Sequence, residues 1–362
     1  MTDIAFRIER NETPYPAQAR AEVIADPGFG THFTDHMVLI DWTVEDGWHD
    51  ARVVPYGPLQ LDPASAVLHY GQEIFEGLKA YRHEDGSVHT FRPEMNAARM
   101  RRSAERLALP QLPDELFIEA IRQLVEIDQE WVPEAGAGKA LYLRPFTIAN
   151  ENFLGVRAAH RATFCVIACP VGSYFRDATR PVSIWLSEHY SRAGRGGTGY
   201  AKCGGNYAAS LLPTNEAYAE GCEQVLFLDA CDGEYLEELG GMNIVLARRD
   251  GTVMTPESDS ILPGVTRDSL LELCERAGLR VERRRISLAE WRDGVASGEI
   301  VEAFACGTAA VVVPIGVLKA RDFTLENPPV TEESLSMRMR AALTGIQNGL
   351  VADELGWLVR LV

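Results

Sequence analysis

The sequence predicts an α+β protein of two domains. At 362 residues the chain is long enough for two hydrophobic cores, and its 46% hydrophobic and 24% charged residues are typical of a globular protein. Apolar runs of strand length and amphipathic segments of helix length follow one another along the chain. The composition changes near residue 176, so we expect an N-terminal domain over residues 1–175, a linker over 176–190 and a C-terminal domain over 191–362.

The N-terminal half is expected to begin with an arm that enters a sheet through the apolar residues 37–42. Strand-forming and aromatic residues at 68–82 are followed by a turn and a second strand. Pro93 opens a predicted helix over 93–107, and apolar residues at helical spacing predict another helix over 114–131. The apolar runs 140–146 and 162–172 predict two buried strands.

The C-terminal half is expected to begin with a helix over 207–221 that Pro213 kinks or interrupts, because proline removes a backbone donor. The further elements follow from turn, cap and apolar patterns. They are a strand over 225–229, a hairpin over 242–256 with its turn at Asp250 and Gly251, a helix from Thr266 to Gly278, a capping box of Ser287 and Glu290, an apolar strand over 304–316 interrupted by Gly307, and a last helix over 331–349.

The formal net charge of −17 would repel phosphate backbones and anionic lipid, so we expect neither nucleic acid nor a membrane as a partner. The first residues lack the apolar core of a signal peptide, and no apolar run is long enough to span a bilayer. We therefore expect a cytoplasmic protein. Seven scattered cysteines predict neither a disulfide framework nor a zinc site, and no metal is expected.

Lys202 lies in the glycine-rich stretch RAGRGGTGYAKCGGN at residues 192–206. The chain has four lysines against 31 arginines, so a lysine among glycines suggests a chemical role that arginine cannot take. The glycines allow close approach to a ligand, and Asn206 is placed to cap a following helix. Two other interpretations stay open here: a dinucleotide site, because GRGGTG fits G-x-G-x-x-G, and a flexible surface loop. The Walker A pattern does not fit, since Cys203 follows the lysine.

An imine-forming lysine, an arginine on a helix, a helix start for phosphate and a carboxylate near an apolar strand are the parts of a pyridoxal phosphate site. From about residue 60 to residue 316 the sequence resembles the branched-chain amino acid aminotransferases of pyridoxal phosphate fold type IV. The stretches that carry the resemblance are LHYGQEIFEGLKAYR, FRPEMNAARMRRSAERL, LYLRPF, CPVGSYF, GYAKCGGNYAASLL, EELGGMNI, LPGVTRDSLLEL and CGTAAVVVP.

The resemblance implies a homodimer whose subunit has a small N-terminal α/β domain and a larger domain with a β-barrel-like sheet. It implies reversible transamination of L-leucine, L-isoleucine and L-valine with 2-oxoglutarate, with pyridoxal 5'-phosphate as the cofactor. Lys202 resembles the lysine that binds the cofactor covalently and moves the substrate's proton. Glu238 resembles the carboxylate that faces the cofactor's ring nitrogen, and Glu237 is the competing assignment. The other implied cofactor residues are Arg99, Thr266, Val265 and Thr308 for the phosphate, Tyr207 for the ring hydroxyl and Leu262 against the ring.

The implied substrate pocket has an aromatic wall that suits branched apolar side chains. Its members are Tyr70, which in relatives comes from the partner subunit, Phe75, Tyr142 and Tyr174. The turn of Thr308, Ala309 and Ala310 resembles the loop whose amides bind the substrate's α-carboxylate. Arg144 resembles the arginine that receives the side-chain carboxylate of glutamate.

Three alternative functions stay open, two of them in enzymes of the same fold and one in another class of enzyme. A D-amino acid aminotransferase and an aminodeoxychorismate lyase share the fold, but the aromatic wall and the long stretch from FRPEMN to LYLRP argue against both. A nicotinamide-dependent oxidoreductase depends on GRGGTG alone.

Overall fold

The computed structural model describes residues 4–136, 138–172 and 180–362, which divide into two compact units. The first unit holds the described residues up to 172 together with Ala201–Gly204 and Ile346–Val362, and the second holds 180–200 and Gly205–Gly345. The first unit thus takes in more than half of the chain, whereas a small N-terminal domain was expected. The difference arises because the segment around Lys202 and the C-terminal segment both pack with the N-terminal elements.

The first unit is built on one sheet in which every neighbouring pair is antiparallel except β1 with β3. Both strands predicted as buried, over 140–146 and 162–172, lie at its centre as β7 and β8. The order of strands is β1 (Arg7–Ile8), β3 (Gly47–Pro55), β2 (His36–Thr43), β8 (Arg161–Val171), β7 (Ala140–Ala149), β5 (Leu78–Arg82), β6 (Val88–Phe91) and β18 (Leu358–Arg360), and β4 (Glu73–Phe75) pairs with β7.

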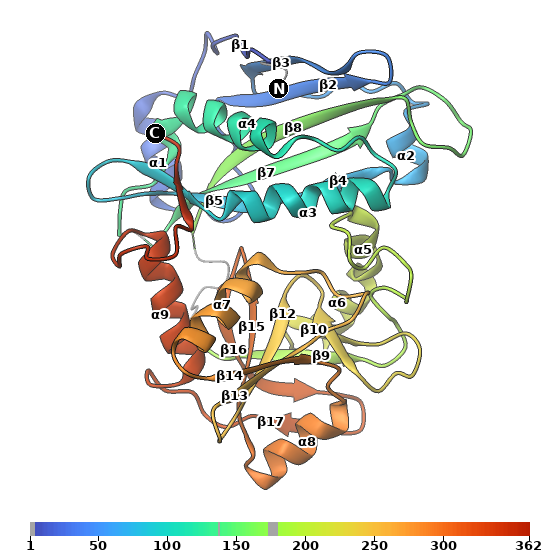
Figure 1. The fold of residues 1–362 in the computed structure, drawn as a ribbon, viewed down its shortest axis with the longest axis vertical. Helices are drawn as coiled ribbons and strands as arrows, with labels where there is room; N and C mark the ends of the chain where they lie inside the picture. The colour runs from blue at the N-terminus through green and yellow to red at the C-terminus, as the bar shows by residue number, and fades with distance from the viewer. Residues whose placement is uncertain (1–3, 137, 173–179) are drawn as a thin grey trace. The chain divides into compact units, whose positions relative to one another are not determined.

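Two long helices cover one face of this sheet (Figure 1). Helix α3 (Pro93–Arg106) begins at the proline that the sequence indicates, and α4 (Asp114–Ile127) buries Phe117, Ile121 and Leu124 against β2 and β8. The predicted helix over 114–131 is confirmed, although its last residues form the short 3-10 helix η1 (Gln129–Trp131). The remaining helices of this unit are α1 (Ala17–Ala25) and α2 (Ala66–Tyr70).

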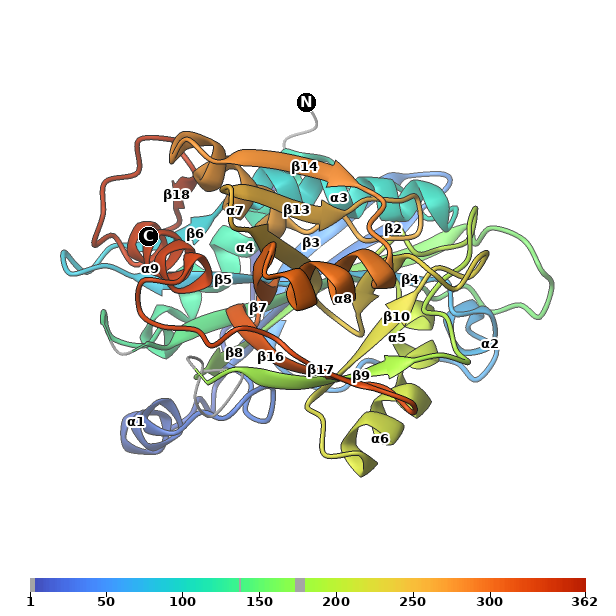
Figure 2. The ribbon, with the colours of Figure 1, turned by 90° about the horizontal axis from the view of Figure 1, so that it is seen from below.

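The second unit is built on a mixed sheet (Figure 2), in which β9 lies between β10 and β16. Strand β9 (Val182–Ser187) lies inside the segment 176–190, which was expected to be a linker. The strand was not predicted because its apolar run is short and the charged residues on either side dominate the composition of the segment. The order is β11 (Leu236–Leu239), β10 (Gln224–Leu228), β9, β16 (Val311–Lys319), β15 (Ile300–Gly307), β12 (Asn243–Arg248), β13 (Thr252–Pro256) and β14 (Arg280–Arg284), and β17 (Thr324–Glu326) pairs with β16.

The helices of the second half follow the predicted pattern. Pro213 interrupts the helix over 207–221, which splits into α5 (Gly204–Ala209) and α6 (Leu211–Ala219), so that the proline lies in the first turn of α6, where its missing N–H costs no helical bond. The Ser287 hydroxyl caps α8 (Leu288–Ser297) by accepting a hydrogen bond from the backbone N–H of Glu290. The other helices are α7 (Val265–Arg276) and α9 (Leu335–Gln347). Within the described ranges, none of the helices is long and apolar enough to cross a membrane.

Candidate functional site

The expected site residues of the first unit gather around the ring of Phe75. The Lys202 amino group lies 4.5 Å from the centre of this ring, and the Arg144 guanidinium carbon lies 4.8 Å from it. Arg144 also donates a hydrogen bond to the hydroxyl of Tyr142 at 3.0 Å. Strands β4 and β7, which pair with each other, supply the three aromatic and arginine positions. Two cations therefore share one aromatic ring, which favours an anionic or electron-rich group beside them.

The backbone of Lys202 is fixed by β4 and α3. Its carbonyl accepts a hydrogen bond from the N–H of Phe75 at 3.0 Å, and its own N–H donates to the Ser103 hydroxyl at 2.9 Å. Two residues later, the N–H of Gly204 donates to the carboxylate of Glu73, whose pKa is raised by burial although this hydrogen bond works in the opposite direction. The loop thus presents the lysine from a rigid backbone and is not the flexible surface loop considered as an alternative.

Arg99 forms a buried ion pair with Glu76. Its Nε and Nη2 donate to the two carboxylate oxygens at 2.7 and 2.8 Å, and Asn96 donates to the same carboxylate at 2.7 Å. Burial raises the pKa of the Glu76 carboxyl, but the charges of Arg99 and Lys202 and the hydrogen bonds from Arg99 and Asn96 together hold this pKa below its usual value. A guanidinium has five N–H donors, so one arginine can bind Glu76 and a phosphate oxygen at the same time.

Gly77 allows the Tyr142 ring to take its place in this group. A Cβ atom at position 77 would lie 2.1 Å from the Tyr142 hydroxyl oxygen, which is far inside van der Waals contact. We expect Gly77→Ala to lower the free energy of unfolding by about 1–3 kcal/mol through overpacking. Chemical denaturation measures the loss.

Two further variants check that the Tyr142 hydroxyl causes this loss. Gly57→Ala places its new methyl group in open space and should be nearly neutral. Adding Tyr142→Phe to Gly77→Ala removes the clashing oxygen and should recover part of the stability. If the double variant is less stable than Gly77→Ala alone, the clash is not the cause.

Tyr70, another member of the expected aromatic wall, has its own partner in the first unit. Tyr70 is 39% exposed, and its hydroxyl donates to the carbonyl of Leu154 at 2.5 Å. Other exposed apolar side chains lie close to Tyr70 and Leu154 in sequence, at Leu68 and Val156. Tyr174 lies outside the described residues.

In the second unit the buried carboxylate of Glu238 lies at the centre of the expected residues. It forms an ion pair with Arg192 Nη1 and accepts a hydrogen bond from the backbone N–H of Leu262, both at 2.8 Å. Glu238 is 2% exposed and Arg192 3% exposed. A buried guanidinium beside a carboxylate favours its charged form, which is the form that a protonated ring nitrogen requires.

Sequence reasoning did not find Arg192. The residue lies in the glycine-rich stretch with a second arginine, Arg195, and nothing in the order of residues distinguishes the two. Its Nη1 also approaches the carbonyls of Gly199 and Ser260, at 3.4 and 3.3 Å. Arg192 thus connects the glycine-rich loop to the Glu238 carboxylate. The two residues are far apart in sequence, so no local pattern predicts their contact.

Glu237, the competing assignment, has a different environment from Glu238. Its side chain is also buried, but its partner is the hydroxyl of Ser260, and its Oε2 has no hydrogen-bond partner in the described part of the chain. Burial and the neighbouring Glu238 raise the pKa of Glu237. The neutral acid form suits this surrounding, so Glu238 is the better candidate for a permanent negative charge.

The start of helix α7 is buried and lacks a side-chain cap. Gly264 occupies the N-cap position, and Val265 and Thr266 are 6% and 7% exposed. A Cβ atom at Gly264 would lie 2.0 Å from the Asn243 side-chain oxygen, and the Asn243 amide holds the Leu262 carbonyl at 3.1 Å. Buried N–H groups of a helix start need acceptors, and a phosphate group supplies them.

Tyr207 and Asn206 lie on α5, and their roles differ. The Tyr207 ring lies beside Gly241, where a Cβ atom would contact it at 3.8 Å. Asn206 does not cap a helix, as the sequence suggested, because its amide exchanges two hydrogen bonds of 2.7 Å with Thr198. It therefore closes the loop that contains GRGGTG, and α5 begins only at Gly204, so the loop lacks the tight strand-to-helix turn of a dinucleotide site.

Thr308, Ala309 and Ala310 form the turn between β15 and β16, whose first paired residues are Gly307 and Val311. The predicted strand over 304–316 is therefore a hairpin. Gly307 lies directly against Met242, which follows Gly241 and precedes Asn243. The turn and the residues that hold the start of α7 thus occupy one region of the second unit.

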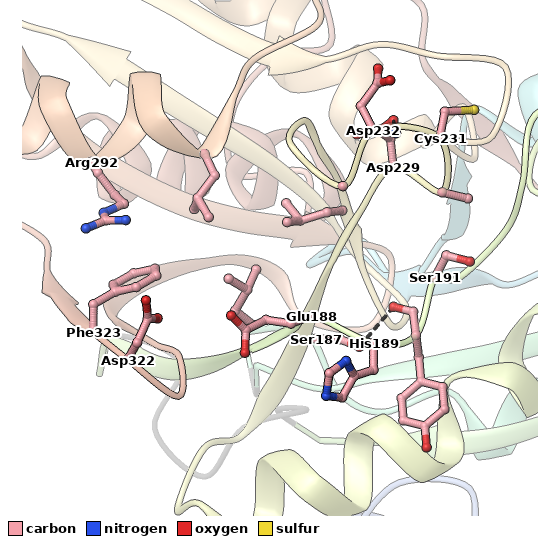
Figure 3. Close-up of a pocket in the computed structure, with 16 residues that line it drawn as sticks. Ser187, Glu188, His189, Ser191, Asp229, Cys231, Asp232, Arg292, Asp322 and Phe323 are labelled. Carbon is pink, nitrogen blue, oxygen red and sulfur yellow. Dashed lines mark hydrogen bonds between the residues drawn. The ribbon is translucent and has the colours of Figure 1, made fainter.

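A separate pocket of about 460 Å³ lies where β9 and β10 end, and it contains none of the expected site residues (Figure 3). Four carboxylates line it, from Glu188, Asp229, Asp232 and Asp322. This concentration of negative charge would repel the α-carboxylate of an amino acid. The expected residues around Phe75 and Glu238 remain the better candidates.

Comparisons with known proteins agree on one family. The sequence model of the family described as amino-transferase class IV matches residues 73–317. The branched-chain-amino-acid aminotransferase of Mycolicibacterium smegmatis is 53% identical, over 99% of this chain and 98% of its own. The branched-chain amino acid aminotransferase of T.th. has been solved in complex with N-(5'-phosphopyridoxyl)-L-glutamate and with 4-methylvaleric acid. Each of these structures is 27% identical, has a TM-score of 0.72 and covers 89% of this chain and 98% of its own.

Proposed function

The chain belongs to the class IV aminotransferase family, and we propose from this that it is a branched-chain amino acid aminotransferase that uses pyridoxal 5'-phosphate. Its reaction moves the amino group of L-leucine, L-isoleucine or L-valine to 2-oxoglutarate, and the reverse. Relatives of known name at up to 53% identity over nearly the whole chain support this activity. The acidic partner substrate is our proposal from the chemistry of Arg144.

One observation carries the proposal. The buried carboxylate of Glu238 holds the N–H of Leu262, and three residues further on the uncapped start of α7 is buried. A negative charge for a ring nitrogen, on β11, therefore contacts the short segment that leads into a set of N–H donors for a phosphate. Few ligands other than a phosphorylated pyridine need both groups.

The cofactor, when bound, supplies an aldehyde that takes the amino group and a ring that withdraws electrons from the substrate's α-carbon. Glu238, kept ionised by Arg192, would hold the ring nitrogen protonated. Val265 and Thr266 would bind the phosphate through their backbone N–H groups, and Arg99 would add guanidinium donors. Lys202 would bind the cofactor and then carry a proton to and from the α-carbon.

The substrate's side chain is proposed to contact the aromatic rings of Phe75 and Tyr142. Arg144 has no carboxylate partner among the described residues, and its Nε is buried without a hydrogen-bond partner. Its side-chain partner in these ranges is the hydroxyl of Tyr142. A buried donor of this kind needs an acceptor, and the side-chain carboxylate of glutamate or 2-oxoglutarate supplies one.

We expect Arg144→Met to separate the two classes of substrate. The KM for glutamate and 2-oxoglutarate should rise about 30-fold or more, because an unpaired buried carboxylate costs at least about 2 kcal/mol. The KM for leucine and its 2-oxo acid should change by less than about threefold, since an apolar side chain needs no such partner. Steady-state kinetics in both directions gives these values.

Tyr142→Phe is the matched control. It removes the hydroxyl that orients Arg144 but keeps the aromatic wall, so it should act in the same direction with a smaller effect. Equal losses for leucine and glutamate in Arg144→Met would mean that Arg144 is structural. The absence of any loss would place the acidic substrate elsewhere.

A homodimer and a cytoplasmic location complete the proposal. Leu68, Tyr70, Leu154 and Val156 are exposed on the first unit, and Tyr70 contacts Leu154, so these apolar side chains suit a subunit contact. All seven cysteines are free, and six of them are buried, which suits a reducing compartment.

A further inference from the structure

Val311 has a backbone conformation that β-branched residues rarely adopt. Its φ is +64°, in the left-handed region, directly after the turn of Thr308, Ala309 and Ala310. Hairpins with three-residue loops usually place glycine at such a position, because it has no Cβ atom to clash. Val311 is 9% exposed, so it is also fixed within the packed second unit. The surrounding structure must therefore hold the strained conformation in place.

Arg340, on helix α9, binds the carbonyls of the two residues on either side of Val311. Its Nη1 donates to the carbonyl of Ala310 at 3.0 Å and to the carbonyl of Val312 at 2.7 Å. The residue lies 29 positions further along the chain, so the contact is not a local feature of the hairpin. One guanidinium nitrogen thus bridges the two carbonyls that flank the strained residue.

The bond to the Ala310 carbonyl opposes the motion that would relax Val311. Rotation of the peptide plane between Ala310 and Val311 by half a turn would move φ of Val311 to the negative side, where valine is unstrained. The same rotation would turn the Ala310 carbonyl away from Arg340 and break its hydrogen bond. Arg340 therefore selects the strained form of the turn.

The charge of Arg340 has no carboxylate partner in the described ranges, where its side chain bonds to the two carbonyls. Desolvation lowers the pKa of its guanidinium, but arginine stays charged at neutral pH. The Arg340 side chain is half-buried, so water screens this charge only in part. This charge lies beside the turn that the sequence predicts to bind the substrate's α-carboxylate.

We propose that Arg340 is a positioning residue that keeps the turn of Thr308, Ala309 and Ala310 in the shape that binds the substrate's α-carboxylate. This inference rests on the proposed function. Every substrate of the reaction carries an α-carboxylate, so the effect of Arg340 extends to leucine and glutamate alike. Arg144, by contrast, is proposed to affect the binding of glutamate and not that of leucine.

The test measures binding of 4-methylvaleric acid, an unreactive carboxylate with the carbon skeleton of leucine, to the cofactor-loaded protein by calorimetry. Arg340→Met should weaken this binding at least about tenfold, because the turn is free to relax. The neutral 4-methylvaleramide should bind the variant and the parent protein equally. Arg340→Lys keeps a charged donor and should recover part of the affinity. Steady-state kinetics should show KM raised for all substrates, with a smaller change in kcat.

A double variant tests the link to backbone strain. Glycine tolerates positive φ, so Arg340→Met with Val311→Gly should bind 4-methylvaleric acid more tightly than Arg340→Met alone. Thermal unfolding by circular dichroism shows whether Arg340→Met folds, and Arg340→Gln takes its place in the same measurements if it does not.

The inference is overturned by unchanged binding of the acid in the Arg340 variant, by an equal loss for acid and amide, or by a double variant as weak as Arg340→Met. Failure of the proposed function has a different signature. In that case the parent protein itself neither binds 4-methylvaleric acid nor converts leucine with 2-oxoglutarate, whatever residue stands at position 340.

Discussion

Lys202→Ala is expected to abolish transamination, with a loss of at least about 10⁴-fold in kcat, because one amino group both binds the cofactor and moves the proton. The fold should survive the change. The bonds that fix this position, from the N–H of Phe75 and to the Ser103 hydroxyl, involve only the backbone of Lys202, and alanine keeps both. Turnover of leucine measures the first result, and thermal unfolding measures the second.

Lys202→Arg is the informative companion, because it keeps the positive charge beside the Phe75 ring but has no amine to react. It should be as inactive as Lys202→Ala. Borohydride reduction of the unaltered protein should fix the cofactor on the peptide that contains Lys202. Labelling at Lys79, Lys139 or Lys319 instead, or turnover in either variant, would disprove the assignment.

Glu238→Gln is expected to lower kcat by at least about 10²-fold, the loss typical of removing one preorganised electrostatic partner. The amide still offers an oxygen to the N–H of Leu262, so the local shape is kept. It no longer carries the charge that pairs with Arg192, and a buried charge left unpaired costs about 3–5 kcal/mol of stability. Kinetics, cofactor absorbance and thermal unfolding should therefore all change.

Glu237→Gln makes the same chemical change at the neighbouring buried carboxylate. Burial raises the pKa of Glu237, so glutamine resembles the protonated acid that already suits this position. Its effects on rate and stability should both be small. A large loss of rate in Glu237→Gln, with Glu238→Gln nearly unaffected, would reverse the two assignments.

The regular elements were predictable where one segment carries its own signal. The apolar face of α4, the proline that opens α3 and the Ser287 cap of α8 are all local patterns, and the structure confirms them. Strand β9 was missed because its apolar run is short and charged residues flank it. Strand β18 carries too few residues to be recognised apart from its partner β6.

In the candidate site, too, the sequence predicted only those residues that lie in a recognisable local pattern. Sequence blocks indicated Lys202, Glu238 and Arg144, but not the groups that hold them. Arg192 reaches Glu238 across 46 positions, and Glu76 reaches Arg99 across 23. Such pairs are set by the way strands and helices pack, and no spacing along the chain predicts them. The strain at Val311 was hidden for a similar reason, since valine favours an ordinary strand.

The chain passes repeatedly between its two units, and this has a consequence for how the protein is made. Strand β18 completes the edge of the first sheet beside β6, yet the ribosome produces it only after the whole second unit. Until then β6 is an open edge, which is prone to pairing with other chains. Contacts between such distant segments form slowly, so we expect the emerging chain to keep an unfinished sheet until its last residues are made. Protection by chaperones during synthesis would therefore matter more for the first unit than for the second.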